Sequence, residues 1–306
     1  MTIDYSCKSN ILLEDEQGLR VPMDQPYYRA AEIAPDTWQI LSDGDFSYLL
    51  KGEDGDALLI DTGYGAGNIR EYCESLCGCS VSRAVNTHHH FDHTALNCYF
   101  DLVYMAEESV DLAAIPYPSF DGIQFPRDYQ VQIVGDEDII PLKGRDLKVF
   151  KMPDHAVGSI VLLDEKKRLL FGGDEFGLPF GKPVSGTVEN WARLLKKLGP
   201  CRGLYDAVWC GPGQADSGIV EKQLVNCKHV LNGEEGKPYV RPPFNAWQET
   251  DNEGRIVWKR QFPHPGDGPK NWVDESAWTR RYGDSPAAIV YDIRRIFDAQ
   301  VKEESK

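Results

Sequence analysis

Histidine and aspartate residues are concentrated in one short segment of this chain. Residues 87–93 read Thr-His-His-His-Phe-Asp-His and directly follow a predicted strand. Side chains alternate between the two sides of an extended backbone, so His88 and His90 can converge on one metal ion. Asp92 and His93 then face a neighbouring position. The spacing therefore predicts a site for two metal ions.

His89 alternates to the opposite side, so we expect it to lie behind the ligands or in solvent. Five of the seven histidines lie within residues 88–93 or at His155. Imidazole and carboxylate groups at this density suit zinc or iron. A histidine-rich surface loop would have a similar composition, but four ligand-type residues at this spacing after a strand favour a metal site.

Three further short motifs follow predicted strands along the chain. They are Asp61-Thr62-Gly63, Asp154-His155-Ala156-Val157-Gly158-Ser159 and Gly172-Gly173-Asp174. Taken alone, Gly-Gly-Asp would indicate only a turn. In this order, together with the His-x-His-x-Asp-His segment, the motifs resemble those of the metallo-β-lactamase superfamily. The resemblance covers about residues 36–232 and does not extend to the C-terminal segment.

The resemblance implies an α/β fold, the four-layer αββα metallo-β-lactamase sandwich, with the metals at one edge between two sheets. It implies that His155 completes the first metal site with His88 and His90. It also implies that Asp174 bridges the two metals and that Asp61 supports the metal loop.

The fifth motif of the family departs from the usual pattern. Family members usually end a strand in Pro-Gly-His, whereas residues 209–214 read Trp-Cys-Gly-Pro-Gly-Gln. An amide oxygen binds zinc or iron more weakly than imidazole does. Asp92, His93 and Asp174 would therefore hold the second ion with water or Gln214. We expect zinc as two ions, with a single ion, or iron or manganese, as the alternatives.

The resemblance implies a hydrolase that cleaves a thioester, lactone, ester or amide of a small molecule through a metal-activated hydroxide. Asp92 is the candidate catalytic residue, which orients the nucleophile or acts as general base. The wording of the main motif is most similar to that of hydroxyacylglutathione hydrolases. Two alternatives remain, which are a mononuclear iron oxidoreductase resembling persulfide dioxygenases and a family member that has lost activity.

Alternating and helical hydrophobic patterns predict the elements that must position these residues. A meander with turns at Asp43-Gly44 and Asp54-Gly55 leads into mixed α/β structure. The predicted strands are 37–41, 46–51, 57–61, 83–87, 102–105, 129–134, 147–152, 159–163, 169–171 and 207–210, and the predicted helices are 69–76, 107–115, 188–198 and 219–231.

We predict two regions, a catalytic domain at residues 1–235 and a C-terminal extension at residues 236–306 that packs on the core or on a partner subunit. The extension is rich in proline and aromatic residues up to about residue 278. A hairpin is expected around residues 252–254. A final helix is expected from Ser285-Pro286, with Ile289, Ile293, Ile296 and Phe297 on one face.

The net charge of −15 opposes binding to nucleic acids and to anionic membrane surfaces. The first ten residues show no secretion signal and no segment is apolar enough to span a bilayer, so a cytoplasmic location is expected. A small-molecule substrate is the expected partner, with a homodimer as a further candidate. Loops 115–127 and 176–183 would border its pocket, where Arg127 or Lys182 either steers a carboxylate or is a solvated cation.

Overall fold

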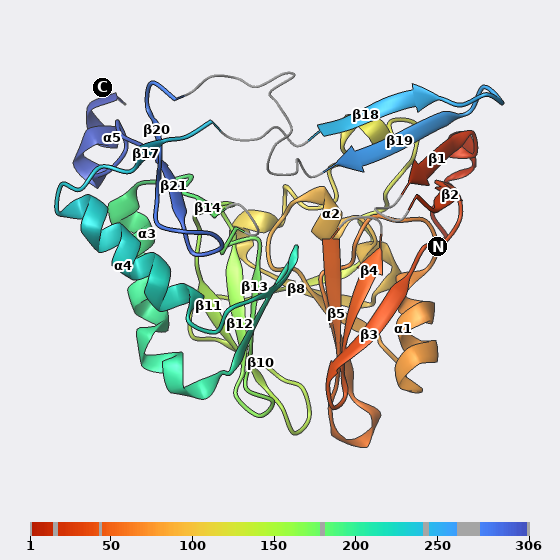
Figure 1. Cartoon of the computed structure of the whole chain (residues 1–306). Helices are drawn as coiled ribbons and strands as arrows, with labels where there is room; N and C mark the ends of the chain where they lie inside the picture. The colour runs from red at the N-terminus through yellow and green to blue at the C-terminus, as the bar shows by residue number, and fades with distance from the viewer. Residues whose placement is uncertain are drawn as a thin grey trace.

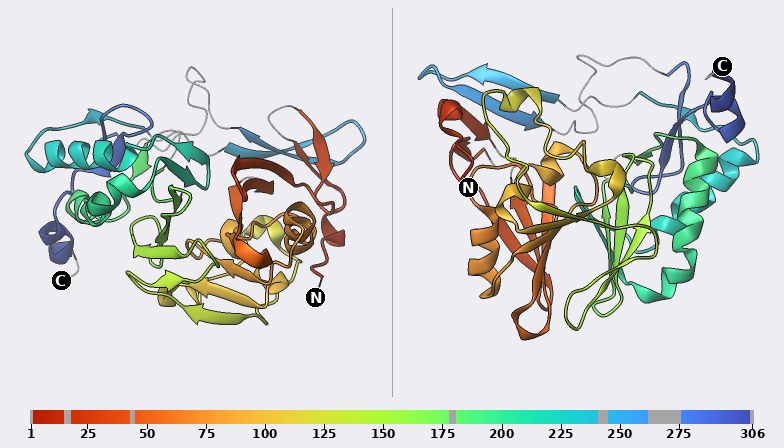
Figure 2. Two further views of the ribbon diagram at one scale, coloured as in Figure 1. Left: turned by 90° about the horizontal axis from the view of Figure 1, so that it is seen from below. Right: turned by 180° about the vertical axis from the view of Figure 1, so that it is seen from behind.

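The structure is a computed structural model that describes residues 2–14, 18–42, 45–177, 181–240, 245–261 and 276–304. Two β-sheets face each other at the centre, and helices lie on their outer sides (Figure 1). The views from below and from behind show the two termini on opposite sides of the molecule (Figure 2). The predicted turn at residues 43–44 lies outside the described residues.

The first sheet contains seven strands in the order β3-β4-β5-β6-β7-β8-β9. The strands are β3 (Arg29–Ala34), β4 (Thr37–Ser42), β5 (Asp45–Lys51), β6 (Ala57–Ile60), β7 (Arg83–Val85), β8 (Leu102–Met105) and β9 (Gln130–Ile133). β3 to β6 form an antiparallel meander, and β6 to β9 are parallel. The predicted strands in this region are confirmed. β6 and β7 end just before Asp61 and Thr87, so parallel pairing brings these motifs to one edge.

The second sheet contains six strands in the order β10-β11-β12-β13-β15-β16. They are β10 (Ile139–Ile140), β11 (Leu147–Lys151), β12 (Ile160–Asp164), β13 (Leu169–Gly173), β15 (Ala207–Cys210) and β16 (Gly213–Ala215). β13 and β15 are parallel, and both end at the edge where Asp174 and Gly211 follow. The predicted strands of this half are confirmed as well.

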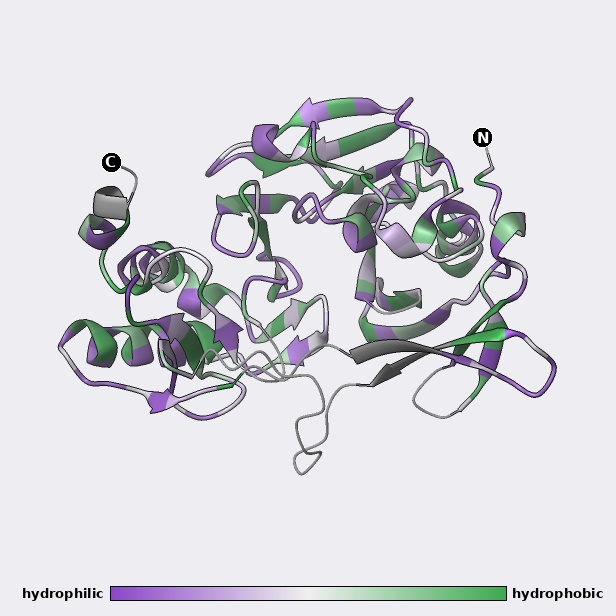
Figure 3. Cartoon of the chain, turned by 90° about the horizontal axis from the view of Figure 1, so that it is seen from above, coloured by the Kyte–Doolittle hydropathy of each residue, from purple (hydrophilic) through white to green (hydrophobic). Residues whose placement is uncertain are grey.

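Three separate apolar cores lie between successive layers of the fold, so the fold has four layers. One core packs α1 (Ile69–Cys77) on the first sheet, one lies between the two sheets, and one packs α3 (Val188–Leu198) and α4 (Ile219–Leu231) on the second sheet. Hydrophobic and hydrophilic residues are mixed along each helix (Figure 3), because only one face of each helix packs on a sheet. The αββα sandwich is therefore confirmed.

Local sequence sets the ends of these helices. The Asn68 side chain accepts hydrogen bonds from the amides of Arg70 and Glu71 at the start of α1, and Gly78 ends that helix with a φ of 70°. The Thr187 side chain accepts from the Asn190 amide at the start of α3. The short elements are α2 (Phe91–Thr94) and the 3-10 turns η1 (Ser6–Lys8), η2 (Glu53–Gly55), η3 (Asn97–Tyr99), η4 (Glu107–Ser109), η5 (Pro118–Phe120) and η6 (Gly199–Leu204).

The predicted helix at residues 107–115 is wrong, because only η4 and turns form there. The Ala114 amide donates to the Thr94 hydroxyl at 2.7 Å, and Ala114 itself has a φ of 54°. A hydrogen bond to a distant residue therefore replaces the one that would continue the helix.

The predicted final helix from Ser285 is also wrong, because this segment contains the strand β21 (Ile289–Asp292). β21 pairs with β20 (Thr279–Tyr282) and with β14 (Lys182–Pro183), and β20 pairs with β17 (Lys237–Pro238). Residues 287–291 are all buried, which an amphipathic surface helix cannot achieve. Helix forms only in α5 (Asp298–Glu304).

The predicted hairpin around residues 252–254 is confirmed as β18 (Asn245–Thr250) and β19 (Ile256–Gln261). β19 pairs in parallel with β1 (Ile11–Glu14), which pairs with β2 (Arg20–Pro22). The hairpin thus docks on strands from the start of the chain. The division between residues 235 and 236 stays a prediction. Among the described residues, no helix has the length and apolar character needed to cross a membrane.

Candidate metal centre

Four segments bring histidines and carboxylates to the edge between the two sheets. His88 and His90 follow β7, and the short helix α2 carries Asp92 and His93 at the upper ends of the strands (Figure 1). His155 follows β11, while Asp174 follows β13. The ends of strands from both sheets therefore assemble the predicted residues at one place.

His88, His90 and His155 form the first group. Nε2 of His88 and Nε2 of His155 each lie 3.0 Å from Nδ1 of His90. A tetrahedral ion with Zn–N bonds of about 2 Å separates its ligand nitrogens by about 3.3 Å. The three imidazoles thus converge as ligands of one zinc ion would.

Asp174 and His93 form a second group with His88. Nε2 of His93 lies 3.6 Å from Oδ1 of Asp174 and 3.9 Å from Oδ2 of Asp92. The other carboxylate oxygen of Asp174 lies 3.6 Å from Nε2 of His155. Asp174 therefore faces both groups with different oxygens, as a bridging ligand does.

Two atoms of the second group test whether the residues fit a metal. His93 Nε2 and Asp174 Oδ1 are buried and have no hydrogen-bond partner among the described residues. A buried polar atom without a partner is costly, and such atoms usually indicate an ion, a water or a functional role. Here the two atoms lie 3.6 Å apart, and Oδ2 of Asp92 lies 3.9 Å from the same His93 nitrogen, so they fit a bound cation.

A third group contains a residue that the sequence analysis did not select. Asp45, Asp92 and His93 place ligand atoms within 4.8 Å of one another. Asp45 begins β5, which runs antiparallel to β6. The start of β5 therefore lies beside the end of β6. Because the antiparallel meander was predicted from the sequence, the closeness of these two strand ends could have indicated Asp45.

Asp61 supports the metal loop rather than joining it. Its Oδ2 lies 2.9 Å from Nδ1 of His93 and accepts a hydrogen bond from the Thr87 hydroxyl at 2.8 Å, and its Oδ1 accepts from the Thr87 amide at 2.7 Å. Such carboxylate–histidine contacts orient imidazole ligands. The structure thus places Asp61 where the family resemblance implies it.

Neither expectation for Lys182 holds, because this residue is fully buried. Its Nζ lies 2.8 Å from Asp154 and 3.1 Å from Glu175, and 4.7 Å from the centre of the Trp191 ring. Glu175 in turn accepts a hydrogen bond from the His155 amide at 2.8 Å. Lys182 therefore neutralises two carboxylates beneath the metal loops.

Three more residues singled out from the sequence are Gln214, His89 and Arg127. Gln214 lies in β16 opposite Trp209 with an exposed side chain, and its role as a ligand stays a prediction. None of the three ligand groups found among the described residues includes His89. Arg127 is exposed, and its guanidinium donates to the carbonyl oxygens of Val110 and Asp111.

Burial and neighbouring charges separate the histidines into two kinds. Burial, reinforced by nearby imidazoles, holds the pKa of His88 well below its usual value. Burial also lowers the pKa of His155 to about 4. Burial would lower the pKa of His93 too, but the carboxylates of Asp61, Asp174 and Asp92 outweigh it and raise that pKa well above the usual value. The first group is thus neutral and ready to bind a metal.

Glycine is required at two points where backbone approaches the cluster. A Cβ atom at Gly211 would lie 2.1 Å from Oδ1 of Asp174, and one at Gly173 would lie 2.6 Å from the Thr87 hydroxyl oxygen. The glycines of the fourth and fifth motifs therefore make room for the site.

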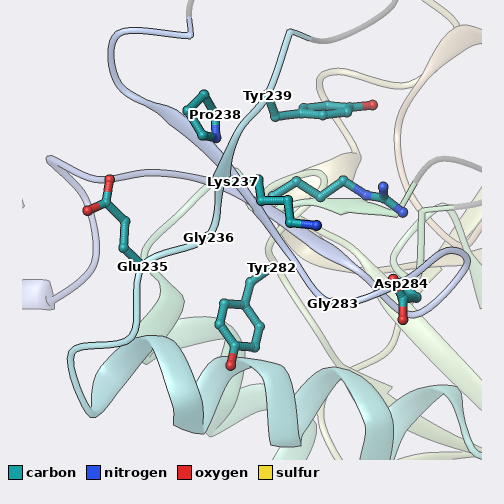
Figure 4. A pocket seen from close by; sticks show the side chains of 9 residues that line it. Glu235, Gly236, Lys237, Pro238, Tyr239, Tyr282, Gly283 and Asp284 are labelled. Atoms are coloured by element: carbon teal, nitrogen blue, oxygen red, sulfur yellow. The ribbon is translucent and has the colours of Figure 1, made fainter.

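A separate pocket of about 350 Å³ lies in the C-terminal segment (Figure 4). It is lined by residues 235–239 and 281–284, around β17 and β20. The lining includes Lys237 and Tyr282 but no residue of the histidine cluster. The pocket is therefore distinct from the metal centre.

Comparison with known proteins agrees with this architecture. Residues 43–209, more than half of the chain, match the model of the metallo-beta-lactamase superfamily. The metallo-beta-lactamase from Pontibacter korlensis shares the fold, with a TM-score of 0.51 and 16% identity over 66% of this chain and 99% of that one. The chain therefore belongs to the metallo-β-lactamase superfamily. Membership implies bound metal ions, typically zinc.

Two kinds of named relatives are similar in sequence. The chain is 30% identical over 212 residues to the acyl-coenzyme A thioesterase MBLAC2 of Bos taurus, which covers 58% of this chain and 70% of that protein. It is 30% identical over 157 residues to the hydroxyacylglutathione hydrolase of Chromohalobacter salexigens, which covers 50% of this chain and 56% of that protein. This chain is accordingly a hydrolase of the superfamily.

Proposed function

We propose that this protein is a zinc-dependent thioesterase that removes an acyl group from a small thiol carrier. The convergence of three imidazole nitrogens on one point, with Asp174 facing both ligand groups, carries the proposal. The names of both kinds of relatives support the substrate class, since they describe acyl groups carried by coenzyme A and by glutathione.

His88, His90 and His155 would hold one zinc ion, and Asp92, His93 and Asp174 would contribute to a second. When bound, zinc polarises a carbonyl oxygen and lowers the pKa of water. Hydrolysis breaks the C–S bond and adds water, which yields a carboxylic acid and a thiol.

Asp92 is the proposed general base. Its Oδ1 accepts a hydrogen bond from the Tyr117 hydroxyl at 2.7 Å, which fixes the carboxylate beside His93. Burial would raise the pKa of Asp92, but the charge of His93 and hydrogen bonds from Asp45 and Tyr117 outweigh it and lower that pKa. The carboxylate is therefore ionised and able to accept the proton of the attacking water.

Apolar surface at and near Tyr117, whose hydroxyl donates to Asp92, supports an acyl substrate. Ile115 and Tyr117 are 53% and 40% exposed, although both are large hydrophobic side chains. The Tyr117 ring packs edge-on against Phe91, with their centres 5.3 Å apart. An apolar surface held in place next to a catalytic carboxylate is a suitable position for an acyl chain.

Release of free thiol tests the proposal. The protein should release thiol from acyl-coenzyme A or hydroxyacylglutathione, monitored with a chromogenic disulfide reagent, while a matched oxygen ester and a lactone should react more slowly. His90→Ala should abolish thiol release and the binding of the first zinc ion. His229→Ala, an exposed histidine paired with Glu234, is the matched control and should keep both. Faster turnover of the lactone or oxygen ester would contradict the thioesterase assignment.

A further inference from the structure

The second metal position lacks the histidine that the family usually supplies from its fifth motif. In this chain Gln214 occupies that position in the sequence, and its side chain is exposed on β16. The buried Nε2 of His93 and Oδ1 of Asp174 nevertheless lie 3.6 Å apart without hydrogen-bond partners among the described residues. The site is thus built for a cation, and another ligand is expected.

Asp45 lies where that ligand is needed. Its carboxylate, the Asp92 carboxylate and a His93 nitrogen lie within 4.8 Å of one another. Three carboxylates, those of Asp45, Asp92 and Asp174, therefore gather around one fully buried imidazole. Like charges this close repel one another unless a cation or a proton lies between them.

The backbone explains how β5 reaches the position of the fifth motif. The Phe46 amide donates to the carbonyl oxygen of Gly211 at 3.0 Å, and the Tyr48 hydroxyl donates to the carbonyl oxygen of Cys210 at 2.5 Å. These bonds join the start of β5 to the end of β15, which leads into the fifth motif. Gly211 also lies close to Asp174 and His93. The start of β5, which carries Asp45, therefore lies next to the fifth motif at the second site.

We propose that Asp45 is a ligand of the second metal ion, in place of the histidine that family members carry at the position of Gln214. The proposal rests on the proposed function only in assuming a two-metal centre. The second site then holds one imidazole and three carboxylates, whereas the first holds three imidazoles. Oxygen ligands suit harder ions, so the second site should accept manganese more readily than the first does.

Metal titration of the full chain tests the assignment without using activity. After removal of metal with a chelator, zinc is titrated against a chromophoric competitor, and bound zinc is counted by elemental analysis. In Asp45→Asn the first ion should bind as in the wild type, and the second should bind at least about 10-fold more weakly, as loss of a supporting ligand requires. Asp45→His, which offers a nitrogen ligand, should retain the second ion.

Two variants serve as controls. Asp54→Asn alters a carboxylate near the other end of β5 whose side chain is 74% exposed, and it should leave both affinities unchanged. Gln214→Ala should do the same if Asp45, and not Gln214, binds the ion. Thermal unfolding of the metal-free variants identifies any that misfold. If Asp45→Asn misfolds, retention of the second ion by Asp45→His and its loss in Asp45→Leu decide the question.

The results separate this assignment from the proposed function. Two tightly bound ions in Asp45→Asn, or loss of the second ion in Gln214→Ala alone, would overturn the role of Asp45. A wild-type protein that binds only one ion would overturn it as well, even if thioesters are hydrolysed. A wild-type protein that binds two ions through Asp45 but hydrolyses no thioester would leave the assignment standing and refute the thioesterase.

Discussion

Nδ1 of His93 lies 2.9 Å from Oδ2 of Asp61, and this contact determines which way the imidazole faces. With Nδ1 held by Asp61, Nε2 faces the carboxylates of Asp92 and Asp174. Asp61 is in turn fixed by the amide and the hydroxyl of Thr87, directly before the metal loop. The first motif therefore acts on the second metal site through His93.

Replacement of Asp61 by Asn should weaken the second metal ion selectively. An amide keeps the size of the side chain but loses the charge that orients and supports the imidazole, and such changes lower metal affinity by about 10–100-fold. Zinc titration should show the first ion unaffected. Asp101→Asn, at a carboxylate whose side chain is 72% exposed, is the control. Equal loss of both ions would contradict a specific effect through His93.

Lys182→Met should destabilise the whole fold. The substitution leaves the buried carboxylates of Asp154 and Glu175 without their cation, and breaking a buried ion pair in this way costs about 3–5 kcal/mol. Urea unfolding measures the loss. Lys143→Met removes an exposed pair with Asp54 and should change stability by less than about 1 kcal/mol. Similar losses in both variants would show that burial of the Lys182 ion pairs does not increase their contribution to stability.

The two metal-binding steps should differ in their dependence on pH. Burial lowers the pKa of His155 to about 4 and that of His88 well below its usual value, so protons compete little for the first site between about pH 6 and 8. The raised pKa of His93 keeps that imidazole protonated in the metal-free protein, and the second ion must displace the proton. Burial and the charges of Asp174 and Asp92 also raise the pKa of Asp45, so a proton on this proposed ligand adds to the effect. Second-site affinity should therefore rise with pH, by up to about 10-fold per unit for each proton displaced.

Calorimetry in two buffers with different ionisation enthalpies measures the proton release of each step. A proton should leave with the second ion and little should leave with the first. Proton release confined to the first ion would show that the charge of His93 is assigned wrongly.

Removal of metal should lower the thermal stability of the protein. A ligand present at about 1,000 times its Kd stabilises the folded state by about 4 kcal/mol. For a chain of this size such a change should lower Tm by about 6 °C. Zinc should restore the wild-type Tm, whereas magnesium, which prefers an all-oxygen shell, should not. His90→Ala should show a much smaller shift, and an equal shift would place the stabilising ion elsewhere.

Sequence alone was sufficient for the features that depend on neighbours along the chain. His88 and His90 lie two residues apart before α2, and Asp92 and His93 are neighbours on that helix and not in extended backbone as predicted. Their close spacing is nevertheless local, as are the caps at Asn68, Thr187 and Gly78. The fold class followed from the ordered motifs and from the alternation of strands and helices. These features need only a few consecutive residues.

Only the tertiary structure decided which distant segments meet. Asp45 joined the metal cluster because β5 pairs with β6 and bonds to Gly211, and no spacing links residue 45 to residue 93. Lys182 became buried because Asp154 and Glu175 surround it. The segment around Ile289 became a strand because β14 and β20 offered free edges. In each case hydrogen bonds or charges from remote residues outweighed local propensity, which differs by only about 1 kcal/mol between ordinary residues.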